Sequence, residues 1–429
     1  MQKILIALLS LIFFVQTASA AENISVGASE TESTDLICAF TSMAAYSDDT
    51  GLFARDMLSS RGWEIYGIKN KNSRANVKAY LIGKKFIGDK NIKILVIAGT
   101  EDLKDVEVDF RLGRVGLESD EVGEDKIFVH RGFRDYTDAA LSDGVKEYLL
   151  DELKKNPAET LYITGHSLGG AVALMTAVRL CESGANMNQI KVVTFGAPAL
   201  GNKNFVDAYQ DKINLRRIAI SGDVIKKSLQ VLGYVQFGDF VEYKATESEN
   251  HNSHAMALYL ECALKNYYDA ENVYKFVDVD EKNKITTPIY VAPIKILKKS
   301  FTPEDEKYIK QLFIDGLQSR LTNLTFAGEK FVEVEKEEQF SYDVTEFLKS
   351  AQAANCKFIL VQNLHAKTVK NSQPRETRVT LDEMIFDSEG RLLSMQTAGP
   401  TTKDLTIIEA TTFAQESLRK NREKIFSAH

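Results

Sequence analysis

The chain has 429 residues, of which 44% are hydrophobic and 26% are charged, a balance typical of a soluble globular protein with two or three domains. The formal net charge of -7 argues against nucleic acid or an anionic membrane surface as an electrostatic partner. None of the four cysteines is spaced as in a metal-binding motif, so the sequence predicts no structural metal.

The N-terminus has the pattern of a secretory signal peptide. Lys3 provides a positive start, residues 4–15 are predominantly apolar, and residues 18–20 read Ala-Ser-Ala. The apolar stretch is too short to span a bilayer, whereas the small residues suit cleavage. No later segment is long and apolar enough to span a membrane. We therefore expect cleavage near Ala20 and export of a soluble protein to the periplasm or the extracellular space.

Residues 21–284 are predicted to form a domain in which strands and helices alternate. Short apolar runs with the composition of buried strands lie at 93–97, 161–164, 191–195 and 217–220. Helices are predicted over 132–155 and 171–178, and residues 233–243 alternate as in a β-hairpin. Buried strands separated by helices indicate an α/β fold, with a parallel sheet covered by helices on both faces.

A run of charges at 278–284 predicts a linker to a second, smaller α+β domain over 285–429. Pro303 directly follows Thr302 and predicts a helix from this point to about residue 321, because proline suits the first helical position. The other expected elements are a helix after Asp343, a helix over 405–426, and strands over 289–297, 331–334, 357–369, 377–386 and 391–396, the last two joined by a turn at 387–390. This pattern only weakly resembles small domains of exported cell-envelope proteins. A docking module for an envelope or protein partner and a purely structural role are both open.

The sequence Gly-His-Ser-Leu-Gly-Gly at 165–170 lies between the strand at 161–164 and the helix at 171–178. A serine at the apex of such an elbow has a strained backbone that exposes its hydroxyl, and small flanking residues let the strand and the helix pass closely. Ser167 is therefore the predicted nucleophile, with Gly165 and Gly169 providing the room.

A serine hydroxyl needs an imidazole to accept its proton, and in hydrolases of this type the imidazole follows the serine in the chain. His251, His254, His365 and His429 follow Ser167. His254 opens an expected helix and is the predicted base, with His251 as the alternative. His365 lies inside an expected strand of the second domain, where a structural role is expected.

The predicted acid is Asp223, which follows the strand at 217–220, because a carboxylate just past the carboxyl end of a parallel strand points into the site crevice. Two backbone N–H groups should bind the oxyanion: that of Leu168, directly after the nucleophile, and that of Thr100, after the strand at 93–97. A solvated aspartate and an ordinary turn are the simpler interpretations of Asp223 and Thr100.

Over residues 36–265, these pieces and their order resemble the class 3 lipase family, the fungal triacylglycerol-lipase-like branch of the α/β-hydrolases. The matching segments are Ala98-Gly99-Thr100 with Asp105 and Asp109, His130 to Phe133, the elbow, Thr194 to Pro198, Asp223, Gly233 to Tyr243, and His254 with Tyr259. The resemblance implies a serine ester hydrolase, a lipase or carboxylesterase, with acylglycerol-type lipids as the expected substrate class. It also implies a triad of Ser167, His254 and Asp223 that forms an acyl-enzyme without a metal or an organic cofactor.

The chain departs from the family pattern at Ala98, Val106 and Val224, where arginine, tryptophan and proline are usual. Residues 110–126 correspond to the family's lid but lack a contiguous apolar face for a lipid surface. The acidic residues of this stretch are Glu118, Asp120, Glu121, Glu124 and Asp125. An esterase acting on small or dispersed esters is therefore plausible beside a true lipase, and we expect no jump in activity when substrate passes its solubility limit.

Two other interpretations fit the same residues. A phospholipase or an acyltransferase would use the same triad on another substrate, whereas a non-catalytic envelope protein would use the hydrolase fold for binding alone.

In an oxidising compartment, a disulfide between Cys38 and Cys262 would tie the two ends of the first domain together, but free buried thiols fit equally well.

Overall fold

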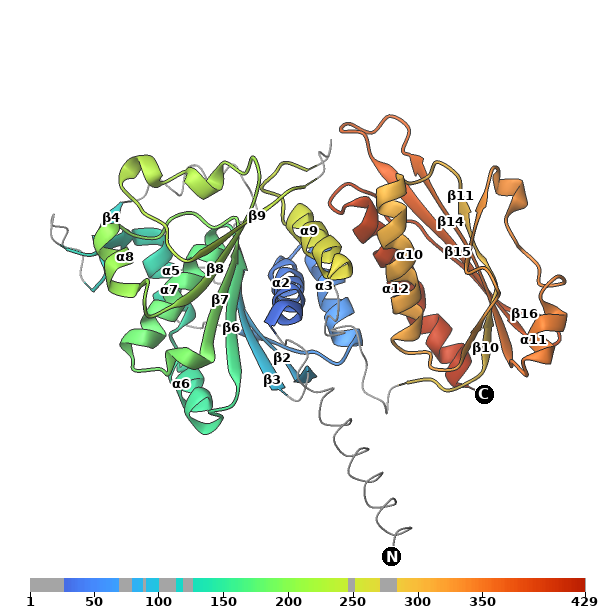
Figure 1. Cartoon of the computed structure of the whole chain (residues 1–429), viewed down its shortest axis with the longest axis horizontal. Helices are drawn as coiled ribbons and strands as arrows, with labels where there is room; N and C mark the ends of the chain where they lie inside the picture. The colour runs from blue at the N-terminus through green and yellow to red at the C-terminus, as the bar shows by residue number, and fades with distance from the viewer. Residues whose placement is uncertain are drawn as a thin grey trace, which may run out of the picture.

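The computed structural model describes residues 27–68, 79–87, 90–99, 113–118, 126–245, 251–270 and 284–428. These residues form two large β-sheets with helices packed between them, so the expected α/β fold with a second sheet-rich region is confirmed (Figure 1). Within the described ranges, none of the helices has the length and apolar character needed to cross a membrane. The expected signal peptide and all but the last residue of the expected linker lie outside these ranges.

The first sheet has the strand order β1-β2-β3-β6-β7-β8-β9. Strands β3, β6, β7, β8 and β9 run parallel, and β1 and β2 extend the sheet antiparallel beyond β3. The bounds are β1 (Glu64–Ile68), β2 (Ala79–Ile87), β3 (Lys90–Ile97), β6 (Thr160–His166), β7 (Ile190–Phe195), β8 (Asn214–Ile220) and β9 (Asp239–Tyr243). All four strands expected from apolar runs are therefore present, and their carboxyl ends meet at one edge of the sheet.

Helices cover both faces of this sheet, with α2, α3 and α9 on one face and α5, α6, α7 and α8 on the other (Figure 1). Ile94 and Val96 of β3 face the core that includes α2 and α9, whereas Leu95 and Ile97 face the core that includes α7. Burial on both faces is why the strands are continuous apolar runs in the sequence. The bounds are α2 (Gly27–Ala44), α3 (Asp49–Ser60), α5 (Arg131–Ala140), α6 (Val145–Lys155), α7 (Leu168–Glu182), α8 (Lys203–Tyr209) and α9 (Met256–Asp269), with a small sheet of β4 (Arg114–Gly116) and β5 (Phe128–His130).

The single helix expected over 132–155 is two helices, α5 and α6. The chain turns between them, where Asp143 has a φ of 54° and Gly144 a φ of 86°. Two consecutive residues with left-handed backbone cannot continue a right-handed helix, although the apolar periodicity continues across the break.

The β-hairpin expected over 233–243 is wrong. Residues 239–243 form β9, which pairs in parallel with β8, and Val235 makes an isolated bridge with Gly201. Tyr234 and Phe237 precede β9 and belong to no strand, yet their side chains are buried in the core beside α7. Single side chains that reach a core produce the same pattern as a strand.

The disulfide hypothesised between Cys38 and Cys262 is also wrong, because both are free thiols. Cys38 on α2 lies in hydrogen-bonding contact with Thr164 of β6 and so faces the sheet. Cys262 on α9 lies in the same buried apolar cluster as Cys38, near Glu409 of α12 (Ile407–Ser427). Burial raises the pKa of the Cys262 thiol to about 12, and it raises that of Cys38 further.

The second sheet is built around β14, which pairs in parallel with β10 and β11 and antiparallel with β15. The strand expected over 289–297 is two strands, β10 and β11, because Pro293 between them has no N–H to donate. On its other side, β10 pairs in parallel with β12, and β11 pairs in parallel with β13. The bounds are β10 (Ile289–Val291), β11 (Ile294–Leu297), β12 (Leu324–Phe326), β13 (Phe331–Val334), β14 (Phe358–Thr368), β15 (Thr377–Asp387) and β16 (Leu392–Ala398).

The helices of this C-terminal region (residues 284–428) are α10 (Pro303–Gln318), α11 (Leu348–Ala353) and α12. As expected, Thr302 caps α10, and its side chain accepts a hydrogen bond from the backbone of Asp305 at 3.1 Å. Helices α10 and α12 lie between the second sheet and α9, whereas α11 lies on the far face (Figure 1). A single buried apolar cluster includes side chains of α2, α9, α10 and α12, so the two sheets share a continuous core.

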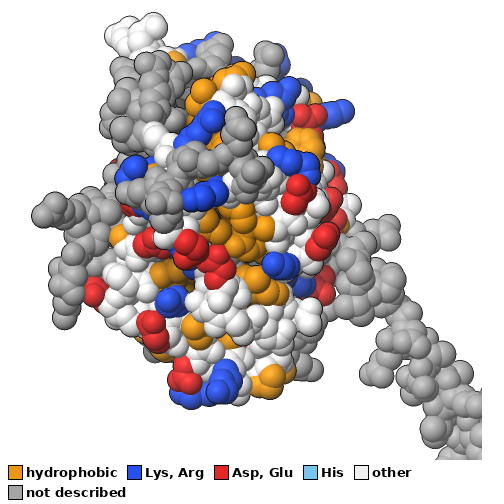
Figure 2. Space-filling model, turned by 90° about the vertical axis from the view of Figure 1, so that its left-hand side faces the viewer, with side chains coloured by type: hydrophobic (Ala, Val, Ile, Leu, Met, Phe, Trp, Pro, Cys, Tyr) orange, Lys and Arg blue, Asp and Glu red, His pale blue; other side chains and the backbone are white. Residues whose placement is uncertain are grey.

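Acidic and basic side chains are interspersed on the face at the left of Figure 1, where α5 and α8 lie, around small apolar areas (Figure 2). Acidic and basic side chains also pair directly, since the guanidinium of Arg179 on α7 lies 2.9 Å from Glu118 and 2.9 Å from Asp138. A mixed surface of this kind does not produce a broad field of one sign.

Candidate active site

The elbow is formed by the junction of β6 and α7. Ser167 has φ 56° and ψ -128°, a backbone conformation that residues other than glycine rarely adopt. A Cβ on Gly165 would lie 2.5 Å from the carbonyl carbon of Gly169, and a Cβ on Gly169 would lie 2.3 Å from the backbone oxygen of Ile97. Only glycine therefore allows β6, α7 and the end of β3 to approach this closely, which is the role predicted for both glycines.

Three side chains from distant parts of the chain converge beside the elbow. The Oγ of Ser167 lies 2.8 Å from Nε2 of His254, and Nδ1 of His254 lies 2.8 Å from Oδ2 of Asp223. Asp223 follows β8 and His254 precedes α9, so both reach Ser167 at the carboxyl edge of the first sheet. The three residues are buried, with exposed fractions of 1% for Ser167, 2% for Asp223 and 4% for His254. This arrangement can pass the hydroxyl proton to the imidazole while the carboxylate stabilises the cation that forms.

Four histidines follow Ser167 in the sequence; His429 lies outside the described residues, and the structure separates the other three. His254 is the one whose ring reaches the hydroxyl of Ser167. The His251 ring instead makes a hydrogen bond with the backbone of Asp404 in the C-terminal region. His365 lies on β14, where its Nδ1 is 2.9 Å from Glu337.

Asp223 is held by more than the imidazole. Its Oδ2 also accepts a hydrogen bond of 2.5 Å from the hydroxyl of Tyr259, and its Oδ1 accepts one of 2.9 Å from the N–H of Ile225. Burial acts to raise the pKa of Asp223, but the hydrogen bond and charge of His254, with the other two donors, hold that pKa below its usual value. The carboxylate therefore stays ionised beside the imidazole.

A second histidine, His166, contacts the backbone of His254. His166 Nε2 lies 2.8 Å from the backbone oxygen of His254, and His166 Nδ1 lies 2.6 Å from the hydroxyl of Tyr46 on the loop after α2. A carbonyl oxygen can only accept, so Nε2 carries the proton and Nδ1 accepts from Tyr46. Burial, followed by the charge of His254, lowers the pKa of His166 to about 3, so this ring is neutral.

Gly196, at the end of β7, lies directly under the acid and the base. Its φ is 58°, and a Cβ there would lie 2.8 Å from Oδ2 of Asp223, 2.8 Å from the hydroxyl of Tyr259 and 3.1 Å from Cε1 of His254. The segment over 194–198, which resembles a strand end of the family, is thus the floor on which these side chains rest.

Of the two predicted oxyanion donors, Leu168 lies within the described residues and Thr100 lies outside them. Leu168 is the first residue of α7 and directly follows Ser167, so its N–H lies at a helix N-terminus and has no acceptor within the helix. Thr100, Asp105, Val106 and Asp109 lie outside the described residues. The last residue described before them is Gly99, where a Cβ would lie 3.4 Å from Cβ of Ser167. The loop that follows β3 therefore begins against the nucleophile.

Most of the stretch that corresponds to the family's lid, including four of its five acidic residues, also lies outside the described residues. Glu118 is described, and it pairs with Arg179. Among the described side chains, no group of three or more His, Cys, Asp or Glu residues is placed to hold a metal ion.

Sequence reasoning missed the roles of Tyr46, His166 and Tyr259 in this site. His166 carried a signal, since it directly precedes the nucleophile, and Tyr259 was marked by its distance from His254. Nothing in the sequence pattern marks Tyr46, because its contact with the ring of His166 spans 120 positions.

Residues 94–231 match the family model described as Lipase (class 3). The chain is 37% identical over 91 residues to Toxin TseL of Vibrio cholerae, a match covering 21% of this chain and 13% of that protein. It is 48% identical over 67 residues to Lipase ZK262.3 of Caenorhabditis elegans, covering 15% of this chain and 19% of that protein. It is 31% identical over 98 residues to Phospholipase A1-IIdelta of Arabidopsis thaliana, covering 22% and 23%.

The chain thus spans less than a quarter of the length of each of these three relatives. Among solved structures, a deletion mutant of the Rhizomucor miehei lipase propeptide complex matches with a TM-score of 0.42 and 22% identity, covering 51% of this chain and 69% of that chain. Ser167 and Asp223 lie inside the range matched by the family model, and His254 follows it. Residues 94–231 of this chain are a domain of the class 3 lipase family of hydrolases.

Proposed function

We propose that this protein is a serine carboxylic-ester hydrolase that cleaves the acyl esters of acylglycerol-type lipids. The observation that carries the proposal is the pair of 2.8 Å hydrogen bonds that link Ser167 to His254 and His254 to Asp223. The class 3 lipase domain that contains Ser167 and Asp223 supports it. The strained backbone of Ser167 supports it further, because strain of this kind persists where the surrounding structure enforces it.

In the proposed reaction, Ser167 Oγ attacks the ester carbonyl carbon while His254 Nε2 takes the hydroxyl proton. The carbonyl oxygen becomes an oxyanion, which the N–H of Leu168 stabilises together with a donor from the loop after β3, where Thr100 is the predicted residue. His254 then gives its proton to the leaving alcohol as the C–O bond breaks, and the acyl group remains on Ser167.

Water completes the cycle. His254 takes a proton from water, which attacks the acyl carbon, and the imidazolium then protonates Ser167 Oγ as the acid is released. Throughout, Asp223 keeps the Nδ1 proton of His254 in place, and the hydroxyl of Tyr259 and the N–H of Ile225 hold Asp223.

A second candidate substrate class is the acyl ester of a phospholipid. One relative over 98 residues carries the name Phospholipase A1-IIdelta, which favours including this class. The chemistry at Ser167 would be the same, and the two candidates differ only in the group that leaves.

The test is hydrolysis of an ester panel by the full chain, with wild type beside Ser167→Ala. The panel contains p-nitrophenyl esters of increasing chain length, a triacylglycerol emulsion and phosphatidylcholine vesicles, and a fluorophosphonate probe reports the reactivity of Ser167. We expect release of acid and labelling by wild type and neither by Ser167→Ala. Absence of labelling and of hydrolysis in folded wild-type protein would contradict the proposal.

We further propose that the protein acts after export, because the first twenty residues have the pattern of a signal peptide. Mass spectrometry of the protein recovered from its native compartment should give an N-terminus at Ala21. A mature chain that still begins at Met1 would overturn this proposal.

A further inference from the structure

Helix α9 (Met256–Asp269) links the candidate active site to the C-terminal region. His254 lies two residues before its first turn, and Tyr259 on it holds Asp223. On one side, α9 packs against α2 of the first sheet, and on the other side it faces α10 and α12 (Figure 1). The position of the base therefore depends on packing against α2, which covers the first sheet, and against α10 and α12, which belong to the C-terminal region.

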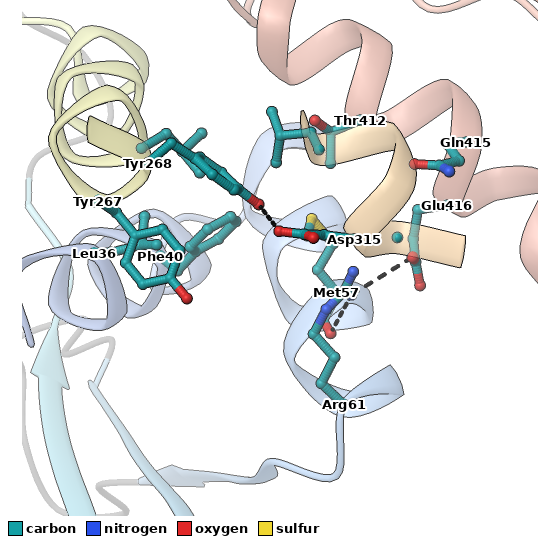
Figure 3. A pocket seen from close by; sticks show the side chains of 13 residues that line it. Leu36, Phe40, Met57, Arg61, Tyr267, Tyr268, Asp315, Thr412, Gln415 and Glu416 are labelled. Atoms are coloured by element: carbon teal, nitrogen blue, oxygen red, sulfur yellow. Dashed lines mark hydrogen bonds and ion pairs between the residues drawn. The ribbon is translucent and has the colours of Figure 1, made fainter. Parts of the chain in front are cut away.

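The contacts between α9 and α10 are polar and specific. Lys265 of α9 lies 3.1 Å from Glu304 of α10, and the same lysine lies 2.9 Å from Glu261 on its own helix. One turn later, the hydroxyl of Tyr268 donates a 2.9 Å hydrogen bond to Asp315 (Figure 3). Asp269 then accepts from the hydroxyl of Tyr308 at 2.7 Å. These contacts fix α9 along its second half.

A second link lies at the other end, beside the base itself. The His251 ring makes a hydrogen bond with the backbone of Asp404, on the loop that leads into α12. Three residues later, the N–H of His254 donates to the side chain of Asn252 at 2.8 Å, so residues 251–254 form a compact turn. The turn that carries the base is thus attached directly to the C-terminal region.

The surrounding interface is closely packed. Arg61, at the end of α3, pairs with Glu416 of α12 at 3.5 Å, and both side chains are buried (Figure 3). A cavity between α2, α3, α9, α10 and α12 has a volume of about 20 Å³, room for about one water molecule. The side chains around so small a cavity are closely packed, and close packing transmits a shift of one helix to its neighbour.

We propose that the C-terminal region acts as a positioning scaffold for the base, with His251 as the positioning residue that ties the turn of His254 to Asp404. This inference rests on the proposed ester hydrolysis. It assigns the C-terminal region a part in the reaction without giving it a catalytic residue. A displacement of a catalytic group by about 1 Å can cost about 100-fold in rate, so a link three residues from the base should have a large effect on turnover.

The test compares His251→Leu, which cannot hydrogen-bond to the backbone of Asp404, with His251→Gln, which can. In the full chain we expect His251→Leu to lower kcat by about 10- to 100-fold with KM nearly unchanged, and His251→Gln to recover most of the loss. Fluorophosphonate labelling of Ser167 should slow by the same factor as kcat. His365→Leu is the matched control, because His365 is a partly buried histidine of the C-terminal region whose partner is Glu337, and its kcat should equal that of wild type.

If His251→Leu does not fold, Tyr268→Phe tests the scaffold from the α10 side, and kcat should fall there too while KM stays constant. Folded His251→Leu with wild-type kcat would overturn the inference, as would an equal loss in His251→Gln and His251→Leu. For Tyr268→Phe, wild-type kcat would count against the scaffold. An inactive, unlabelled wild type would instead contradict the proposed function, so the two failures are distinguishable.

Discussion

The ring of His166 supports the backbone of His254, with Nε2 of the first 2.8 Å from the carbonyl oxygen of the second. His166 thus holds the main chain of the proposed base, while Ser167, the proposed nucleophile, contacts its side chain. Because burial keeps the pKa of His166 near 3, the ring stays a neutral donor across the working range of pH.

Replacing His166 with leucine should therefore impair catalysis without touching the three triad side chains. We expect kcat to fall by about 10- to 100-fold, because the carbonyl of His254 loses its donor and the backbone that carries the imidazole is held less firmly. Tyr46→Phe should have a smaller effect, since it leaves the bond from His166 to His254 in place. Steady-state kinetics on a soluble ester measures both, and a His166→Leu variant as fast as wild type would show that this contact has no role in positioning.

Tyr259→Phe should lower both activity and stability. It removes the 2.5 Å hydrogen bond to Asp223 and leaves the N–H of Ile220 without its acceptor, a loss of about 1–3 kcal/mol in the free energy of unfolding. Urea denaturation of both proteins measures this difference.

Tyr259→Phe should also change how the free energy of unfolding depends on pH. The pKa of Asp223 is lowered in the folded state, so its contribution to stability is present above its unfolded pKa of about 3.9 and is lost as the pH falls through the folded value. Tyr259→Phe removes one of the donors that lower the pKa of Asp223, so this pKa lies closer to its unfolded value in the variant. The difference in the free energy of unfolding between wild type and variant should therefore be larger at pH 7 than at pH 3, and a constant difference would refute this account.

Ser167→Gly should be more stable than Ser167→Ala, although both are inactive. At a φ of 56° and a ψ of -128°, a Cβ is strained by about 1–3 kcal/mol, and glycine relieves this strain. The greater freedom of glycine in the unfolded chain offsets about 0.5–1 kcal/mol of the gain. Thermal unfolding should place Ser167→Gly above Ser167→Ala, and the reverse order would argue against strain at the elbow.

Glu409→Gln should stabilise the protein at neutral pH. Glu409 is buried at the start of α12, and this burial, with the nearby charge of Glu261, raises its pKa well above the usual value. As the pH rises through the unfolded pKa of about 4.3, the unfolded chain releases its proton first, so stability declines. Glutamine does not ionise, so the variant lacks this loss of stability with rising pH. Its side chain can still accept the hydrogen bond from the N–H of Thr406.

The measurement is the free energy of unfolding at pH 4 and pH 7. For Glu409→Gln, the change between the two pH values should be smaller than for wild type. A suitable control is Glu335→Gln, because Glu335 is an exposed carboxylate of the same region, paired with Lys298 at 2.6 Å. Equal pH dependence of wild type and Glu409→Gln would mean that Glu409 is ionised in the folded protein.

Much of the first sheet was predictable because burial on both faces leaves a plain record in the sequence. Strands β3, β6, β7 and β8 each contain a run of buried apolar residues, and the elbow needs glycine at 165 and 169 because a Cβ there would collide with neighbouring backbone. The choice of Asp223 and His254 followed from chain order and from the scarcity of histidine after Ser167. Local sterics and connectivity are properties of the sequence itself.

Contacts between distant segments were decided by the tertiary structure alone. The hydroxyl of Tyr46 reaches His166 only because α2 packs across the sheet, and Cys38 and Cys262 stay free thiols although both lie in one buried cluster. The parallel pairing of β9 and the place of α9 between two layers depend in the same way on long-range packing. A residue pattern specifies which side chains are buried, but the neighbour that each one meets is set by how the buried faces fit together.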